Sequence, residues 1–173
     1  HDSAVKHVTG RAVYIDDMPE PPGTQHASLV LSPHAYARIV SIDVSAAETA
    51  PGVSAVVTAA DIPGVNDIAP VMSDEPLLAA GTADYAGMPV AAVCADTFDQ
   101  AFAAAKLVRI EYEELPAILS IEEAWEKQEF TYTPPKIVFG DAEAAMRSAT
   151  HLVSGEVRCG GQDHFYLESH ISL

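Results

Sequence analysis

The sequence is poor in cysteine and in positive charge, and it has no long apolar run. Its two cysteines, Cys94 and Cys159, lack the paired C-x-x-C spacing of metal and redox sites, and we expect both to be buried free thiols. Nine Lys and Arg residues stand against 25 Asp and Glu, and the net charge of −16 would repel a phosphate backbone or an anionic membrane. No segment approaches the roughly 18 uninterrupted apolar residues of a membrane span, and the first residues have no signal-peptide core. We therefore expect a soluble, cytoplasmic protein with neither nucleic acid nor membrane as a partner.

The short signatures of common enzymes are also absent. The sequence contains no P-loop, no dinucleotide-binding fingerprint, no H-E-x-x-H and no G-x-S-x-G. What remains is a globular composition, with 49% hydrophobic and 20% charged residues over 173 positions. That length allows one ordinary domain, or one small domain and part of another, and either can bury a sizeable core.

Short apolar or alternating segments predict strands over residues 12–15, 27–31, 38–44, 53–58, 89–95 and 109–114. In the third segment we expect Val40, Ile42 and Val44 to face the core, because every second residue of a strand lies on the same face. The fourth is predicted to be a buried strand and the fifth a central one. Residues 66–87 show no periodicity, which predicts a long irregular connection.

Capping signals predict three helices. Thr97 with Gln100, and Ser120 with Glu123, have the spacing of a capping box, and Asp141 is a candidate N-cap for a third helix over residues 142–149. On the first helix, Phe98 and Phe102 fall on the same face as several alanines, and both phenylalanines are predicted to lie in the core. The third helix has alanines and Met146 on its expected inner face.

Strands mixed with two or three helices, without sustained β-α-β repetition, predict an α+β fold. The best linker is the Thr- and Pro-rich run at 131–135, and a further strand is expected over residues 152–157. One helix and one or two strands cannot bury a core alone. We therefore expect residues 1–130 to form one domain, and residues 131–173 to contain a linker and the truncated start of a second domain.

The stretch CGGQDHFYLESH, residues 159–170, is the best candidate for chemistry. Gly160 and Gly161 allow positive φ and close approach by a ligand, and Gln162 offers an amide that can both donate and accept hydrogen bonds. The alternative is a β-bulge at a sheet edge, with Phe165 and Leu167 in the core. The residues alone favour neither interpretation over the other.

Other polar residues give weaker signals. His164 and His170 would lie about 20 Å apart on one strand, too far to bind one metal ion unless the chain bends. Asp16 and Asp17 are expected to solvate a turn. The carboxylates at Glu111, Glu113 and Glu114 are expected to form the solvated face of a strand, with Ile110 and Tyr112 pointing inward. We assign no metal ligand and no catalytic residue.

The segment GGQDHFYLES resembles the GGQEHFYLE motif of the xanthine dehydrogenase and aldehyde oxidase family of molybdenum hydroxylases. Further segments resemble the molybdenum-binding subunit of that family in the same order: HDSAVKHVTGRAVYIDDMPEPPG, LSPHAYARIVSID, PGVSAVVTAADIPGVNDIAP and PVAAVCADTFDQAFAAAKLVRIEYEELPAIL. The resemblance covers essentially the whole chain. It implies an α/β hammerhead domain over residues 1–130, followed by the truncated start of a molybdopterin-binding domain over residues 131–173.

The resemblance also implies a site. The family glutamine that contacts an oxo ligand of molybdenum matches Gln162, next to Gly161, and the implied cofactor is molybdenum–molybdopterin. Iron–sulfur (2Fe-2S) and FAD groups are implied on partner subunits or domains. The family's catalytic glutamate, substrate-orienting arginine and pterin-binding loops would lie beyond this chain, which is expected to be inactive alone. Two positions differ from the family pattern. Asp163 stands where glutamate is usual, and Met88 stands where glutamine is commoner, which puts a polar role for position 88 in doubt.

The resemblance implies that the chain is part of an enzyme that hydroxylates purines, converting hypoxanthine or xanthine to urate with water as the oxygen donor. The substrate of the whole enzyme would be that purine, and its protein partner an iron–sulfur/FAD subunit. One alternative is an aldehyde- or other N-heterocycle-oxidising member of the same family. Another is a non-catalytic docking module for the iron–sulfur and flavin partners.

Overall fold

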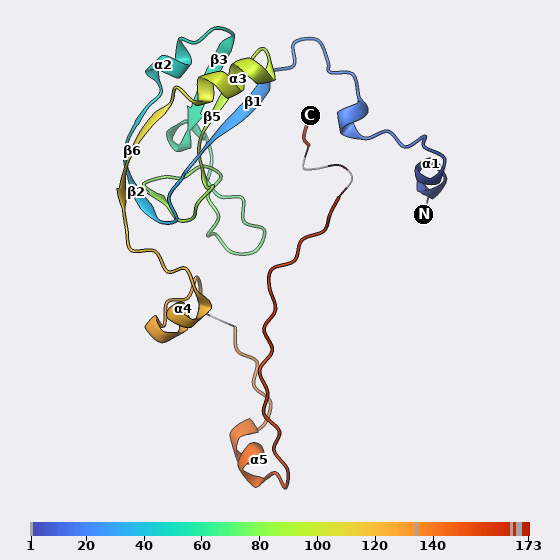
Figure 1. The fold of residues 1–173 in the computed structure, drawn as a ribbon, viewed down its shortest axis with the longest axis vertical. Coiled ribbons are helices and arrows are strands. Elements are labelled where there is room, and N and C mark those ends of the chain that lie inside the picture. The colour runs from blue at the N-terminus through green and yellow to red at the C-terminus, as the bar shows by residue number, and fades with distance from the viewer. Residues whose placement is uncertain (1, 134, 167, 169–170) are drawn as a thin grey trace. The chain divides into compact units, whose positions relative to one another are not determined.

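The computed structural model describes residues 2–133, 135–166, 168 and 171–173. The chain divides into two compact units (Figure 1). The first, called the central unit below, is Glu20–Ala124, and the second, called the terminal unit, combines His1–Pro19 with Trp125–Leu173. The fold mixes helices and antiparallel sheets, which confirms the predicted α+β class. Within the described residues, no helix has both the length and the apolar character needed to cross a bilayer.

The first sheet of the central unit has the strand order β1-β5-β3. Its strands are β1 (His26–Leu31), β5 (Pro89–Ala95) and β3 (Val53–Thr58), and both neighbours run antiparallel to β5. The prediction that residues 89–95 form a central strand is confirmed. β3 was expected to be buried, but it pairs only with β5 among the described strands, and Ser54 and Ala55 are exposed. A β-branched run thus indicated a strand without revealing that it lies at an edge.

The second sheet has the order β4-β2-β6, formed by β4 (Thr82–Ala83), β2 (Ala37–Asp43) and β6 (Arg109–Glu114). The pairing of β2 with β6 shifts register between Ile39 and Ser41, which marks a bulge at Val40. Because the bulge adds one residue to the strand, Ile39 and Ile42 both pack on the core, while Val40 is 59% exposed. The predicted core face of this segment was therefore wrong at Val40 and correct at Ile42.

β5 is buried on both faces. Val90 packs with Met88 and Ala79 against three isoleucines of the second sheet, Ile39, Ile42 and Ile110. Val93 lies three residues further on, so it points to the opposite face, where it packs with Ala104 and Ala105 of a helix. A strand covered on both sides needs apolar residues at every position, which explains why PVAAVCA does not alternate.

The helix on this sheet is α3 (Phe98–Ala105), which packs against β1 and β5 (Figure 1). The predicted cap is confirmed, because Thr97 Oγ1 accepts a hydrogen bond from Gln100 N at 3.3 Å. The prediction that Phe98 and Phe102 are core residues is wrong: they are 57% and 48% exposed. Alanines form the contact face instead, since their small side chains let the helix lie close to the sheet.

The remaining elements of the central unit are short. They are helix α2 (Ser45–Glu48), the 3-10 turn η2 (Ala59–Asp61) and the first residues of α4 (Ile121–Lys127). The long connection at 66–87 is irregular as predicted, apart from the two residues of β4. It is held by the Asn66 side chain, whose Nδ2 donates to Leu78 O at 2.7 Å and whose Oδ1 accepts from Leu78 N at 3.1 Å.

The terminal unit contains α1 (Ala4–Val8), the 3-10 turn η1 (Ile15–Asp17), α5 (Ala142–Ser148) and the last residues of α4. The predicted caps at Ser120 and Asp141 are confirmed by hydrogen bonds from Glu123 N at 3.1 Å and Ala144 N at 2.9 Å. Two predicted strands are not formed. Residues 12–15 lead into η1, and residues 152–157 are extended without pairing to another strand.

Burial in the terminal unit also differs from expectation. The predicted inner face of α5 is exposed, with Met146 at 58%, and α5 buries none of its residues. Both cysteines are free thiols as predicted, but Cys159 is exposed and Cys94 only half-buried. An amphipathic helix buries its apolar face only against a second layer, and the described residues of this unit do not provide one.

Candidate functional site

The GGQ stretch, residues 159–166, is an exposed extended segment outside both sheets. No heavy atom lies within 4 Å of the point where a Cβ would sit on Gly160 or Gly161, and neither has φ in the left-handed region. The pair is therefore not required here by a turn, and it leaves open space beside the backbone. The β-bulge alternative is wrong for this structure, because the segment joins no ladder and Phe165 is fully exposed.

The side-chain amide of Gln162 is not used in hydrogen bonds to other described residues. Its side chain is exposed, and it has no hydrogen-bond partner among the residues that the structure describes. An amide presents two N–H donors and a carbonyl acceptor, so Gln162 can bind a group with either polarity. Next to it, His164 N donates to Asp163 Oδ1 at 2.8 Å, and the His164 ring meets Tyr166 edge-on at 5.9 Å. Leu167 and His170 lie outside the described residues.

Glu168 stands apart from the rest of this region. From Trp125 onward, every described residue is exposed except Glu168 and Ile171, which are half-buried. Glu168 Oε1 accepts a hydrogen bond from Asp16 N at 3.2 Å, a contact across 152 positions of sequence. No sequence motif assigns a role to this carboxylate. Nothing in the local pattern could have identified it, because its partner is a backbone amide near the other end of the chain.

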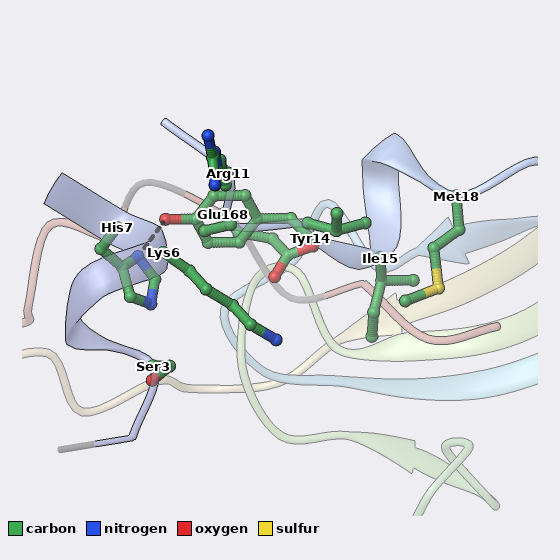
Figure 2. A pocket seen from close by; sticks show the side chains of 10 residues that line it. Ser3, Lys6, His7, Arg11, Tyr14, Ile15, Met18 and Glu168 are labelled. Atoms are coloured by element: carbon green, nitrogen blue, oxygen red, sulfur yellow. Dashed lines mark hydrogen bonds between the residues drawn. The ribbon is translucent and has the colours of Figure 1, made fainter. Parts of the chain in front are cut away.

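Glu168 also lines an open pocket of about 490 Å³ formed with the N-terminal segment (Figure 2). Lys6, His7 and Arg11 line the same pocket, as does Tyr14, whose Oη lies 3.2 Å from His7 Nδ1. Neither Lys6 nor Arg11 has an ion-pair partner within the described part of the chain. Two cationic side chains therefore line the same pocket as Glu168, in a protein that is strongly acidic as a whole.

The turn next to this pocket is built by the two aspartates that were expected to solvate a turn. Asp17 Oδ2 accepts from Tyr14 N at 3.1 Å, while Asp17 N and Met18 N donate to carbonyls of Tyr14 and Ile15. This pattern closes the 3-10 turn η1 on itself and leaves Asp16 N pointing to Glu168. The turn prediction is confirmed, with an added role for Asp17 as a cap.

The carboxylates of β6 are engaged in surface contacts. Glu113 pairs with Arg38, Glu111 Oε2 accepts from Ser41 Oγ at 3.0 Å, and Glu114 lies 3.3 Å from the His34 ring. Ile110 and Tyr112 point inward as predicted. The three glutamates are exposed and separately engaged, so they do not form an acid–base pair.

Tyr112 carries the one notable titration shift in the central unit's interior. Burial raises the pKa of its hydroxyl, and the nearby Ser32 hydroxyl lowers it in part. The Tyr112 Oη atom has no hydrogen-bond partner of good geometry within the described residues. Met88 is likewise interior: it is 1% exposed, and its sulfur accepts from Asp84 N at 3.2 Å. Met88 therefore serves packing in the core of the central unit.

The arrangement suits an outer contact to a bound group more than ligation of a metal by side chains. Among the described residues, no three His, Cys, Asp or Glu side chains come together as a candidate metal site. What the GGQ stretch offers is one unengaged amide beside two glycines with open space around them. Such a set fits the edge of a cofactor that is held mainly elsewhere, with Gln162 supplying a polar contact.

Two protein-family models match the chain. The first, described as the a/b hammerhead domain of aldehyde oxidase and xanthine dehydrogenase, matches residues 9–116, and the second, a molybdopterin cofactor-binding domain, matches residues 124–173. Between them they cover most of the central unit and all of the GGQ stretch.

The proteins that this chain resembles are named for different substrates. The chain is 46% identical to a xanthine dehydrogenase of Oryza sativa subsp. japonica and 40% identical to aldehyde oxidase 1 of Bos taurus, in each case over all of this chain and 13% of the relative. Among solved structures, quinoline 2-oxidoreductase of Pseudomonas putida 86 is 41% identical with a TM-score of 0.61, over 70% of this chain and 16% of that one. The chain thus spans about an eighth of the length of the curated relatives it matches.

Proposed function

Because the chain belongs to the aldehyde oxidase and xanthine dehydrogenase family, we propose that it is part of the molybdenum-binding portion of a molybdenum hydroxylase. The observation that supports this most directly is the unengaged amide of Gln162, beside open glycines, within the region matched by the molybdopterin cofactor-binding domain. We assign residues 1–130 to the hammerhead domain and residues 131–173 to a linker and the start of the cofactor-binding domain.

When bound, the molybdenum cofactor supplies the redox chemistry that inserts oxygen from water into a C–H bond of the substrate. Gln162 would hold the cofactor by a hydrogen bond from its amide N–H. The amide is uncharged, so it would orient the group without adding a charge. Gly160 and Gly161 would let the backbone approach the group closely, because they carry no Cβ and have open space beside them. No residue of this chain is assigned as the proton-transferring base.

The substrate is a purine such as hypoxanthine or xanthine, which is oxidised to urate in the whole enzyme. The higher identity to a xanthine dehydrogenase than to an aldehyde oxidase supports this choice. An aldehyde- or N-heterocycle-oxidising enzyme is the second candidate, favoured by the 41% identity to quinoline 2-oxidoreductase. Electrons would leave through 2Fe-2S and FAD groups on partner subunits or domains. If the whole chain served only to dock these partners, Gln162 would have no assigned role.

The test uses the full-length protein, purified with its cofactors and analysed for molybdenum. We expect molybdenum to be present and xanthine to be oxidised faster than an aldehyde or quinoline. A preference for either of those would overturn the purine assignment while preserving the family chemistry. A protein without molybdenum and inactive on all three substrates would support the docking role.

Gln162→Ala tests the role of the amide. Loss of an outer contact to a metal centre typically lowers activity about 10- to 100-fold. We expect a fall of that size in kcat with molybdenum content unchanged, and a similar fall for Gln162→Glu, which keeps the shape but loses the N–H donors. Gln25→Ala, which removes an amide of the central unit, should leave kcat unchanged. Normal turnover in Gln162→Ala at full molybdenum content would refute the assignment.

A further inference from the structure

The 3-10 turn η1 leaves one backbone donor for a distant acceptor. Asp17 N and Met18 N are satisfied by carbonyls inside the turn, and Tyr14 N by the Asp17 carboxylate. Asp16 N donates to Glu168 Oε1 instead. Backbone donors at the start of a helical turn lack an internal partner, and a carboxylate is a strong acceptor for them. The turn therefore presents a preformed socket for an acidic side chain.

Glu168 is the acidic side chain that reaches this socket. It is half-buried in a region where nearly every other described residue is exposed. Lys6 and Arg11 line the same pocket as Glu168 (Figure 2), and opposite charges attract one another. A hydrogen bond to an ionised acceptor is roughly twice as strong as a neutral one.

The socket lies close in sequence to the proposed cofactor contact. Glu168 lies six positions after Gln162, and an extended chain spans at most about 3.6 Å per residue, or roughly 20 Å in all. Gln162 itself belongs to no strand, and its side chain has no hydrogen-bond partner among the described residues. The contact of Glu168 with Asp16 limits the conformations open to the nearby backbone, which lowers the entropic cost of ordering it.

We propose that Glu168 is a positioning residue that anchors the GGQ stretch to the N-terminal turn at Asp16 and thereby fixes the amide of Gln162 against the cofactor. The inference rests on the proposed function, since it concerns the same contact. It adds that the N-terminal segment is part of the scaffold of the site. Glu168 does not touch the reacting atoms; it acts through the backbone that carries Gln162.

The first test needs no activity. Hydrogen exchange of the full-length protein is followed by mass spectrometry in peptides that cover residues 12–18 and 158–166, with and without Glu168→Ala. We expect the substitution to speed exchange in both peptides by about tenfold or more, because the Asp16 amide loses its acceptor and the stretch loses its anchor. Glu168→Gln, whose amide oxygen still accepts, should preserve most of the protection. Unchanged exchange in both peptides would overturn the proposal.

The second test is kinetic. We expect Glu168→Ala to lower kcat roughly tenfold with KM changed less than about twofold, and Glu168→Gln to restore most of the rate. Because Glu168 acts through Gln162, the double variant Glu168→Ala/Gln162→Ala should be no slower than Gln162→Ala alone. Multiplied losses in the double variant would overturn the positioning role. Glu143→Ala, which removes an exposed carboxylate of α5, is the matched control and should leave kcat unchanged.

The two hypotheses fail differently. If Gln162→Ala has normal turnover at full molybdenum content, the proposed function fails, whatever Glu168 does. If Gln162→Ala is slow but Glu168→Ala is as fast as wild type, only the positioning role fails.

Discussion

The central and terminal units contain similar kinds of sequence but bury them to very different extents. In the central unit, α3 and the second sheet cover the two faces of β5, so that Val90 and Val93 are fully buried. In the terminal unit, α5 has a comparable apolar stripe, yet it buries no residue. The comparison teaches that an apolar pattern specifies which face can be buried, whereas burial itself depends on a second layer that faces it.

The two units also divide the tasks of the molecule. The central unit contains both clusters of buried residues. The terminal unit contains Gln162 and Glu168, and both belong to segments without regular secondary structure. Stability and the proposed cofactor contact can therefore be changed separately, and substitutions of the same kind should have different effects in the two units.

The largest expected effect comes from Met88→Ala. Met88 is 1% exposed and packs with Ala79 and Val90, so its truncation should leave a cavity and lower the free energy of unfolding by about 2–5 kcal/mol. The same change at Met146, which is 58% exposed on α5, should cost less than about 0.5 kcal/mol. Urea denaturation followed by circular dichroism measures both. Equal losses would contradict the contrast between the units.

A second pair of substitutions tests the helix–sheet contact inside the central unit. Ala104→Leu adds volume where α3 lies against the sheet, and we expect a loss of about 1–3 kcal/mol from overpacking. Ala103→Leu, one residue away on the exposed face of the same helix, should change stability by less than about 0.5 kcal/mol. Thermal denaturation compares them. A larger loss at Ala103 would place the contact face where the phenylalanines are.

Removing the helix caps compares the units directly. Thr97→Ala deletes the side-chain acceptor for Gln100 N on α3, and we expect the central unit to lose about 1 kcal/mol. Asp141→Ala deletes the equivalent acceptor on α5 and should leave the unfolding midpoint of the central unit unchanged. Hydrogen exchange resolved by peptide reports each unit separately. A shift of the central unit in Asp141→Ala would show that the two units unfold together.

The smallest expected effect is a pH dependence at Asp61. Hydrogen bonds from Thr58 N and Thr58 Oγ1 lower the pKa of this carboxyl below its ordinary value of 3.8. A group whose pKa is lower in the folded state adds stability above its unfolded pKa and loses it as pH falls through the folded pKa. Wild type should therefore exceed Asp61→Asn in stability near neutral pH, and the difference should shrink below about pH 4. Denaturation curves that stay equally spaced down to pH 2 would contradict this.

Local sequence patterns predicted most of the central unit. The runs at 27–31, 89–95 and 109–114 became strands, and the capping boxes at Thr97 and Ser120 mark the start of helices, because these signals depend on neighbours within a few residues. The same patterns gave wrong predictions where a contact between distant residues determines which side chains are buried. The bulge at Val40 depends on the register with β6, and the exposure of Phe98 and Phe102 depends on which face of α3 meets the sheet.

The two residues of the candidate site show the same difference between local signals and distant contacts. Gln162 was found from a motif, because the glycines and the amide are consecutive in sequence. The contact of Glu168 could not be predicted, since its partner is the backbone N–H of Asp16, and every residue type except proline carries such a group.

By itself, the sequence determined the α+β class, the caps, the central strand β5 and the family, since each rests on short-range periodicity or on motifs read in order. Only the tertiary structure decided which apolar faces are covered, which strands lie at edges and which backbone donor Glu168 reaches. The physical reason is that burial and hydrogen bonding between distant segments depend on where the chain brings them together. Local propensity limits which distant segments can come into contact but does not specify which of them do.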